Sequence, residues 1–314
     1  MTRVLASVDA ASGGSFFRDL VDAGLLIETP VPGVYGRGGA FEDVVLGFDS
    51  LVSRETDHDR AEVVRFPPVL SRHTLEKTGY LGSFPQLAGS VFSFDGGEDE
   101  ALDLGSKALR HEDWSPHQTI TDVSLIPAAC YPVYPWAASS GPLPAGGRLI
   151  DICCYCYRHE PSDDPARMQS FRQREHVRLD TPEVVAGWHG DWIERGGEIL
   201  ESVGLETEVV PANDPFFGRS GRMLKANQRE QRLKLERVIT IARDEPTAIM
   251  SINYHQDHFG HAFDIRGSTG EVAHTACFGF GLERVALALF RVHGIEPATW
   301  PVSVRERLAI GSAS

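Results

Sequence analysis

A long apolar run near the middle of the chain is followed, after a polar stretch, by a second strand-like segment. The run extends from Gly147 to Tyr157, and the second segment extends from Phe171 to Leu179. An apolar run of this length is typical of a buried strand. The two segments therefore predict an antiparallel hairpin whose loop is formed by residues 160–170. This hairpin would place Arg158 and Phe171 on opposite sides of its mouth.

Two arginine-containing motifs, one at the end of the apolar run and one far downstream, indicate a site for a nucleoside triphosphate. The first is Tyr157–Glu160 (Tyr-Arg-His-Glu), and the second is Gly279–Arg284 (Gly-Phe-Gly-Leu-Glu-Arg). Arginine stays protonated at any working pH, and its planar donors fit phosphate oxygens. Two guanidiniums directed into one site can hold ATP and stabilise the charge that develops during attack at phosphorus. Phe171 offers a flat apolar surface for adenine.

These motifs resemble motifs 2 and 3 of the class II aminoacyl-tRNA synthetases, and they occur in the same order. The resemblance implies an α+β fold, an antiparallel sheet of about six or seven strands flanked by helices, and a two-fold homodimer. It implies that Arg158 binds the α-phosphate and the amino-acid carboxylate, and that Arg284 acts with it in catalysis. The further roles it implies are Glu160 at the adenine, Arg167 and Arg284 at the β- and γ-phosphates, and Phe171 stacked on the base.

Three more residues are expected in the ATP site. Met168 follows Arg167 in the predicted loop. Ser251 and Asn253 alternate along a predicted strand, Ala248–Tyr254, just before the second motif, so they would share one face and line the ATP or magnesium site. A further strand is predicted over Glu271–Phe278, followed by a helix over Gly281–Arg291.

A metal site is predicted from three residues that are far apart in the sequence: Cys130, Glu175 and Cys277. Zinc accepts thiolate and carboxylate ligands, and a catalytic zinc uses three protein ligands and keeps a fourth position for water or substrate. Cys277 lies two residues before the glycine of the second motif, so it should face the same cavity as Arg284. Glu175 lies four residues after Phe171, which puts both on one face of a strand.

Two other groups could suggest a metal site. Cys153, Cys154 and Cys156 form a dense cluster, but they lie on an apolar strand whose neighbouring residues face opposite sides, where free cysteine packs as a small hydrophobe. His255, His258 and His261 could bind a metal or act as a base; the alternative is a polar strand end near the nucleotide. We expect neither group to be the metal centre.

The two motifs together with the Cys-Glu-Cys set resemble one branch of the class. This branch comprises the zinc-dependent seryl-tRNA synthetases of methanogenic archaea and their shortened bacterial homologues, the amino acid:[carrier protein] ligases. The resemblance implies that zinc binds the substrate's α-amino group, with Arg158 and Glu175 at the amino acid. The residues before Arg65 are few and are neither strongly basic nor like a coiled coil, so we expect the N-terminal tRNA-binding domain of the full synthetases to be missing. In class II enzymes, a helix followed by a strand that ends in a proline forms the dimer interface and is called motif 1. We expect its counterpart at Leu75–Phe94.

A basic segment in an otherwise acidic protein indicates an anionic partner. The chain of 314 residues has a formal net charge of −14, which weakens a tRNA-binding interpretation. A helix is predicted over residues 217–237, and it carries a stripe of positive charge. The alternative for this stripe is a solvated helix face or a dimer contact. The stripe, which the resemblance assigns to docking of an acidic carrier protein, consists of Arg222, Lys225, Arg229 and Arg232.

The predicted function is ATP-dependent activation of a small amino acid, glycine or alanine, to an aminoacyl-adenylate. The amino acid is then transferred to the phosphopantetheine thiol of a carrier protein, with Zn²⁺ and ATP-bound Mg²⁺ as cofactors. A tRNA-charging enzyme and a non-catalytic synthetase-like regulator are the alternatives. We expect an N-terminal α/β segment at residues 1–64 and a catalytic domain at residues 65–314. The lack of an apolar span or secretory segment favours a cytoplasmic location.

Overall fold

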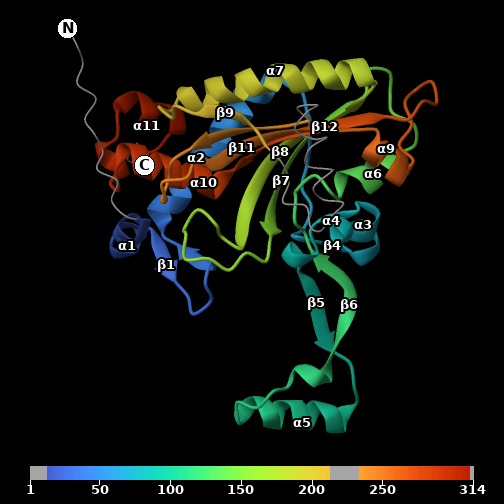
Figure 1. Ribbon diagram of the computed structural model, residues 1–314, viewed down its shortest axis with the longest axis vertical. Helices are drawn as coiled ribbons and strands as arrows, with labels where there is room; N and C mark the ends of the chain where they lie inside the picture. The colour runs from blue at the N-terminus through green and yellow to red at the C-terminus, as the bar shows by residue number, and fades with distance from the viewer. Residues whose placement is uncertain (1–12, 213–232, 312–314) are drawn as a thin grey trace.

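The computed structural model describes residues 13–212 and 233–311, and these residues form a central sheet of seven strands (Figure 1). The strand order is β3-β7-β8-β12-β11-β10-β9, and every neighbouring pair is antiparallel except β3 and β7. The predicted α+β class is therefore confirmed. The strands are β3 (Glu62–Val64), β7 (Arg148–Tyr157), β8 (Ser170–Asp180), β9 (Glu208–Pro211), β10 (Lys234–Ile239), β11 (Thr247–Gln256) and β12 (His274–Gly281).

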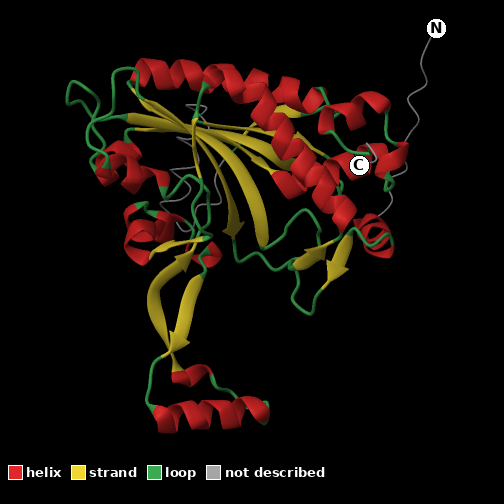
Figure 2. Ribbon diagram, turned by 180° about the vertical axis from the view of Figure 1, so that it is seen from behind, coloured by secondary structure: helices red, strands yellow, loops and turns green. Residues whose placement is uncertain are grey.

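Two hydrophobic clusters cover the two faces of this sheet, because alternate side chains of each strand point to opposite sides. Phe278 and Phe280 of β12 belong to the cluster that also contains the long helices, seen lying across the sheet in Figure 2. Val177 and Leu179 of β8 belong to the other cluster. The helices of the first cluster are α1 (Gly13–Asp22), α2 (Gly39–Thr56), α7 (Pro182–Glu201), α10 (Leu282–His293) and α11 (Val302–Leu308); the second contains α3 (Arg72–Lys77), α4 (Tyr80–Ser83), α6 (Val133–Ser139) and α9 (His258–Phe263).

Two small antiparallel sheets stand beside the central one. Strands β1 (Leu26–Glu28) and β2 (Tyr35–Arg37) pair as a hairpin near the N-terminus. The other sheet has the order β4-β6-β5, with strands β4 (Val69–Ser71), β5 (Ser90–Phe94) and β6 (Gln118–Leu125). Strands β5 and β6 extend away from the central sheet, and helix α5 (Glu98–Leu109) lies at their far end (Figure 1).

Helix α10 starts directly after β12, which places the second arginine motif at a strand-to-helix junction. The strand ends at Gly281, the helix begins at Leu282, and Glu283 in its first turn suits the positive end of the helix dipole. The helix stops at Gly294, whose φ of 95° is a conformation that glycine adopts without strain. This short junction holds Arg284 beside the end of the sheet.

Most of the predicted elements are confirmed. The hairpin is formed by β7 and β8, with Tyr157 opposite Ser170, and the loop between them spans residues 158–169. The strand expected over Ala248–Tyr254 is β11, and the helix expected over Gly281–Arg291 is α10. None of the helices in the described part of the chain is long and apolar enough to cross a lipid bilayer.

Two predictions about individual elements need correction. Residues 213–232, which include Arg222, Lys225, Arg229 and Arg232, lie outside the described residues, but the end of the predicted helix, Lys234–Arg237, belongs to strand β10. Leu235 and Arg237 are buried there, and β10 pairs on both sides, so sheet pairing outweighs the helical spacing of the charges.

The motif 1 type of element was placed in the wrong segment. Leu75–Phe94 contains the short helices α3 and α4, and its strand, β5, belongs to a small sheet. The long helix followed by a strand of the central sheet and a proline occurs earlier, as α2, β3 and Pro67. Strand β3 is only three residues long, which is too short to show a period of two in the sequence.

Candidate active site

A cavity of about 470 Å³ lies where the hairpin of β7 and β8 meets β11 and β12. It joins residues that the sequence separates by more than a hundred positions. Of the predicted site residues, eight line this cavity: Cys130, Arg158, Phe171, Glu175, Ser251, Asn253, Cys277 and Arg284.

Strand β8 supplies one wall of the cavity through its alternating side chains. Phe171, Gln173 and Glu175 all line it, as a strand period of two requires. Glu175 pairs across to Gly279 on β12, where an added Cβ would lie 2.7 Å from Cγ of Glu175. A glycine is therefore needed at position 279, so that the side chain of Glu175 has room beside the neighbouring strand.

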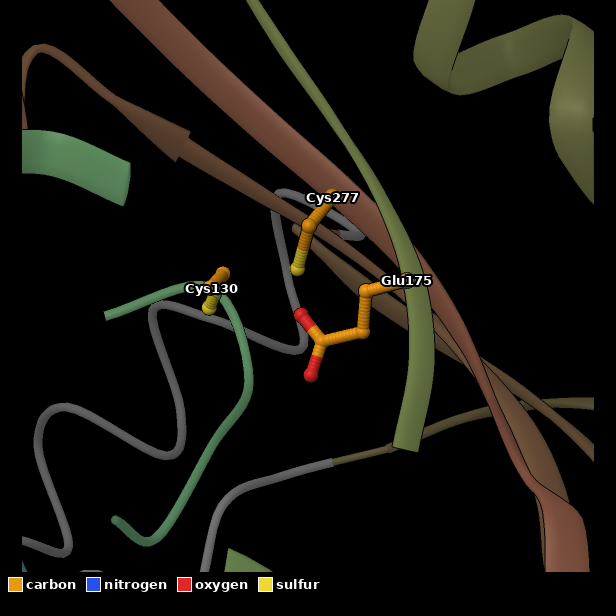
Figure 3. Close-up of side chains that lie close together, drawn as sticks. All are labelled: Cys130, Glu175 and Cys277. Atoms are coloured by element: carbon orange, nitrogen blue, oxygen red, sulfur yellow. The ribbon is translucent and has the colours of Figure 1, made fainter. Parts of the chain in front are cut away.

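Cys130, Glu175 and Cys277 converge at one end of the cavity. Figure 3 shows the three side chains pointing toward one another, Cys130 from the loop before α6, Glu175 from β8 and Cys277 from β12. One donor atom from each lies within 4.8 Å of the others, and all three residues are buried. Oε1 of Glu175 accepts a hydrogen bond of 3.1 Å from the backbone N–H of Ala129, while Oε2 is buried without such a partner among the described residues.

The electrostatics of this group favour a bound cation. Contact with Cys277, together with burial, raises the pKa of Cys130 well above its usual value, and the charge of Glu175 adds to this rise. Burial raises the pKa of Glu175, an effect that the Cys130 thiol and the Ala129 N–H only partly offset. A buried group of two thiols and a carboxyl is suited to a metal ion, because a cation stabilises their anionic forms. The set of two sulfurs and one carboxylate fits Zn²⁺.

Two side chains of β11 lie against the sulfur of Cys277. Nδ2 of Asn253 donates to Sγ at 3.6 Å, and Nε2 of His255 lies 3.6 Å from the same sulfur. Nδ1 of His255 is 3.1 Å from the hydroxyl of the buried Thr275. Asn253 and His255 can therefore orient Cys277, the predicted metal ligand, as residues in contact with metal ligands commonly do.

The nucleotide end of the cavity is built around Arg158, Phe171 and Arg284. The guanidinium of Arg158 lies 5.4 Å from the centre of the Phe171 ring, and its Nε donates to the carbonyl of Pro127 at 3.0 Å. Arg284 donates to the carbonyls of Ala166 and Ala248 at 2.8 and 3.0 Å. Removal from water, together with the charge of Arg158, lowers the pKa of Arg284 to about 10, so it stays charged at neutral pH. Gathered positive charges of this kind suit an anion.

The remaining predicted ATP residues lie in the loop and do not line the cavity. Nη1 of Arg167 is 3.4 Å from Oε1 of Glu160, so the two side chains pair with each other, and both are partly exposed. Met168 is buried and lines a small adjacent cavity with Phe171 and Arg284.

The two alternative groups from the sequence, the cysteines of β7 and the three histidines, do not bring three possible metal ligands together in the described part of the chain. Cys154 and Cys156 pack in one hydrophobic cluster, while Cys153 packs against the other, as the alternation of a strand predicts. His255 and His258 line the cavity, whereas His261 is exposed and 3.4 Å from Asp257.

Sequence reasoning missed one cavity residue that its own rule identifies. Gln173 lies between Phe171 and Glu175 on the same strand face, and its Oε1 accepts from the thiol of Cys156 at 3.1 Å and from the N–H of Ala129 at 3.3 Å. A period of two from Phe171 was the signal that would have found it.

Comparisons with known proteins bear on this site. No protein-family model matches the chain. Two curated relatives from Bradyrhizobium diazoefficiens, amino acid–[acyl-carrier-protein] ligases 2 and 1, are 44% and 45% identical over 292 and 281 residues. These matches cover 93% and 88% of this chain, and 87% and 85% of the relatives.

The solved structures add the fold. In a complex of A. aeolicus tRNASec with the seryl-tRNA synthetase of M. kandleri, the synthetase resembles this chain with a TM-score of 0.80 at 21% identity. The match covers 97% of this chain and 62% of the synthetase, so this chain spans less than two thirds of it. The architecture is that of a class II synthetase.

Proposed function

The chain belongs to the family of amino acid–[acyl-carrier-protein] ligases, and from this premise we propose that it activates a small amino acid with ATP and transfers it to the phosphopantetheine thiol of a carrier protein. As a member of this family, the chain is an enzyme. One observation carries the proposal: a single cavity is lined by Cys130, Glu175 and Cys277 at one end and by Arg158 and Arg284 at the other. An amine and a nucleotide can therefore be held side by side.

At the amine end, Cys130, Glu175 and Cys277 would hold Zn²⁺ and leave one position for the substrate. Zinc held there would supply a position for the α-amino group in its neutral form, which would keep this group from acting as a nucleophile. The charge of Arg158 acts on both Glu175 and Arg284, so its guanidinium suits the amino-acid carboxylate. We propose glycine or alanine as the amino acid.

At the nucleotide end, Phe171 would stack on adenine, and Arg158 and Arg284 would bind the phosphates of ATP together with its Mg²⁺. A carboxylate oxygen of the amino acid attacks the α-phosphorus in line, and the bond to the β-phosphate bridging oxygen breaks. The products are an aminoacyl-adenylate and pyrophosphate. The two guanidiniums stabilise the charge that spreads over the phosphate oxygens. Glu160, Arg167, Met168, Ser251 and Asn253 complete the proposed ATP site.

In the second step, the thiol of the carrier's phosphopantetheine attacks the carbonyl carbon of the adenylate. A carbon–sulfur bond forms, the carbon–oxygen bond to AMP breaks, and the thiol proton is released. We propose that the carrier docks on the basic stripe of Arg222, Lys225, Arg229 and Arg232. A homodimer in the cytoplasm, with residues 1–64 as an N-terminal segment and residues 65–314 as the catalytic domain, completes the proposal.

The test uses the purified chain with ATP and each amino acid in turn. Exchange of label between pyrophosphate and ATP with one small amino acid is the expected result. A second assay offers acyl carrier protein and total tRNA as acceptors of the labelled amino acid, and we expect labelled thioester on the carrier only. Label on tRNA and none on the carrier would refute the transfer step. Absence of exchange with every amino acid would refute activation.

A further inference from the structure

The hairpin formed by β1 and β2, residues Leu26–Arg37, lies against the loop between β7 and β8. Figure 2 shows the two short strands of the N-terminal hairpin beside this loop. The contacts come mainly from the turn of the hairpin. That turn is held by the hydroxyl of Thr29, which donates to the carbonyl of Val34 at 2.7 Å.

Gln169, the last residue of the loop, connects the hairpin to the first arginine motif. Its backbone N–H donates to the carbonyl of Gly33 at 2.7 Å, and its side-chain Nε2 donates to the carbonyl of Pro32 at 2.8 Å. Its own carbonyl accepts from the N–H of Arg158 at 2.9 Å, and its Oε1 accepts from the hydroxyl of Tyr157 at 3.0 Å. Gln169 is only 3% exposed, so these bonds are shielded from water.

Gly33 lies directly over the loop backbone. A Cβ at Gly33 would lie 3.2 Å from the carbonyl oxygen of Arg167 and 3.2 Å from Cγ of Gln169. The φ of Gly33 is +77°, a conformation that other residues rarely adopt. Space and backbone conformation both require glycine at this contact.

Arg37, at the end of the hairpin, contacts the start of β8 and the second arginine motif. Its Nη2 donates to the carbonyl of Ser170 at 3.0 Å and lies 3.3 Å from the carboxylate of Glu283. Glu283 is 1% exposed and precedes Arg284. A single guanidinium therefore ties the end of the loop to the start of α10.

We infer that the N-terminal hairpin is a positioning element of the nucleotide site, which holds residues 158–169 in the conformation that binds ATP. The hairpin itself does not line the main cavity, so it acts through the loop. The inference rests on the proposed function only in taking ATP as the ligand. A long loop without regular structure is flexible unless other parts of the fold hold it. Phosphate binding requires Arg158 and Arg167 of this loop to be held in place.

The test compares Gly33→Ala with Gly24→Ala. Gly24 also has a positive φ, +68°, but an added Cβ there meets nothing within 4 Å, so this control carries the backbone strain without the contact to the loop. For Gly33→Ala we expect the KM for ATP and the Kd for AMP-PNP to rise about tenfold. The KM for the amino acid and the zinc content should stay at the wild-type level. Gly24→Ala should leave all four values unchanged.

A second measurement follows the loop directly. Arg167 is exposed, so trypsin can cleave after it, and we expect cleavage there to be several-fold faster in Gly33→Ala and in Gln169→Leu than in Gly24→Ala. An unchanged cleavage rate with unchanged ATP values would overturn the inference. Equal rises in the KM for ATP and for the amino acid would also overturn it, since they would indicate a general loss of structure. If the wild type catalyses no exchange, the proposed function fails, while AMP-PNP binding and trypsin cleavage still decide the role of the hairpin.

Discussion

The two faces of strand β8 both carry charged side chains, but these charges are paired differently. On the cavity face, Glu175 is buried with one carboxylate oxygen unpaired among the described residues. On the opposite face, Arg172 binds Glu283 and Glu42, and Arg174 binds Asp49 and Asp151, so each charge there has carboxylate partners. The cavity face leaves a charge ready for a ligand, whereas the opposite face neutralises its charges within the fold.

The pKa values reflect the same difference. Burial raises the pKa of Glu175 on the cavity face. Burial acts in the same direction on Asp151, but the contact with His176, whose Nε2 lies 3.6 Å from Oδ2 of Asp151, and the charge of Arg174 prevail and hold its pKa at about 2. We therefore expect substitutions on the cavity face to reduce activity more than stability, and substitutions on the opposite face to do the reverse.

The largest effect is expected for Glu175→Ala. Loss of one of three ligands should remove zinc and lower the exchange rate by roughly 10³-fold, because a bound metal contributes several kcal/mol to catalysis. The free energy of unfolding should differ little from that of the metal-free wild type, since the substitution removes a buried acid with few partners. Metal analysis, exchange kinetics and urea unfolding measure the three quantities. The control is Cys153→Ser, a cysteine outside the site that should keep its zinc. Zinc retained by Glu175→Ala would contradict the assignment.

On the opposite face, Arg174→Met is expected to destabilise the fold. It leaves Asp49 and Asp151 without their shared partner, and breaking a buried ion pair on one side costs about 3–5 kcal/mol. Urea unfolding gives this value, and the zinc content of the folded protein should be unchanged. The matched control is Arg110→Met, an exposed arginine paired with Glu112, for which a much smaller loss is expected because water screens an exposed ion pair. Comparable losses for the two variants would remove the contrast between the faces.

A smaller effect is expected for Phe171→Leu on the cavity face. Loss of the aromatic surface should raise the KM for ATP about tenfold, because stacking of a base on an aromatic ring contributes about 1–3 kcal/mol. The KM for the amino acid should not change, since Phe171 lies at the nucleotide end. Exchange kinetics with each substrate varied in turn separate the two constants. Phe92→Leu on the projecting strand β5 serves as the control. An equal change in both constants would contradict the assignment of Phe171 to adenine.

The smallest effect concerns acid stability. A carboxyl whose pKa is lowered by folding stabilises the native state above its unfolded pKa of about 4, and this contribution is lost as the pH falls toward the folded value of about 2. The free energy of unfolding of the wild type should therefore fall between about pH 4 and pH 2. Asp151→Asn should be less stable at pH 7 and show a weaker dependence in this range. Parallel profiles for the two proteins would show that Asp151 is not the group responsible.

Local sequence patterns predicted the parts of the fold that depend on local chemistry. The apolar run ending at Tyr157 and the glycines around the second motif predicted the hairpin and the junction between β12 and α10. The position predicted for the motif 1 type of element, Leu75–Phe94, was wrong. The strand that fits this element is β3, which joins the central sheet by pairing with β7 and is too short to show an alternation in the sequence. Likewise, the spacing of charges predicted Arg237 in a basic helix, but it belongs to strand β10, which pairs with β11 and β9.

The proposed metal site was predicted through resemblance to a family, since its three residues are scattered and share no local spacing. The structure brings their donor atoms within 4.8 Å of one another. The contact between the N-terminal hairpin and the nucleotide loop could not be predicted at all. Its acceptors are the backbone carbonyls of Pro32 and Gly33, which every residue type possesses.

The amino-acid sequence by itself determined the two strands of the hairpin and the two arginine motifs proposed to bind a nucleotide, because alternation along strands and the chemistry of arginine are local properties. The class of fold and the candidate metal ligands were predicted from the resemblance to a family. Only the tertiary structure decided which charges are neutralised inside the fold and which face the cavity. That division depends on which strand lies beside which, and hydrogen bonding between backbone groups carries no signature in the side chains.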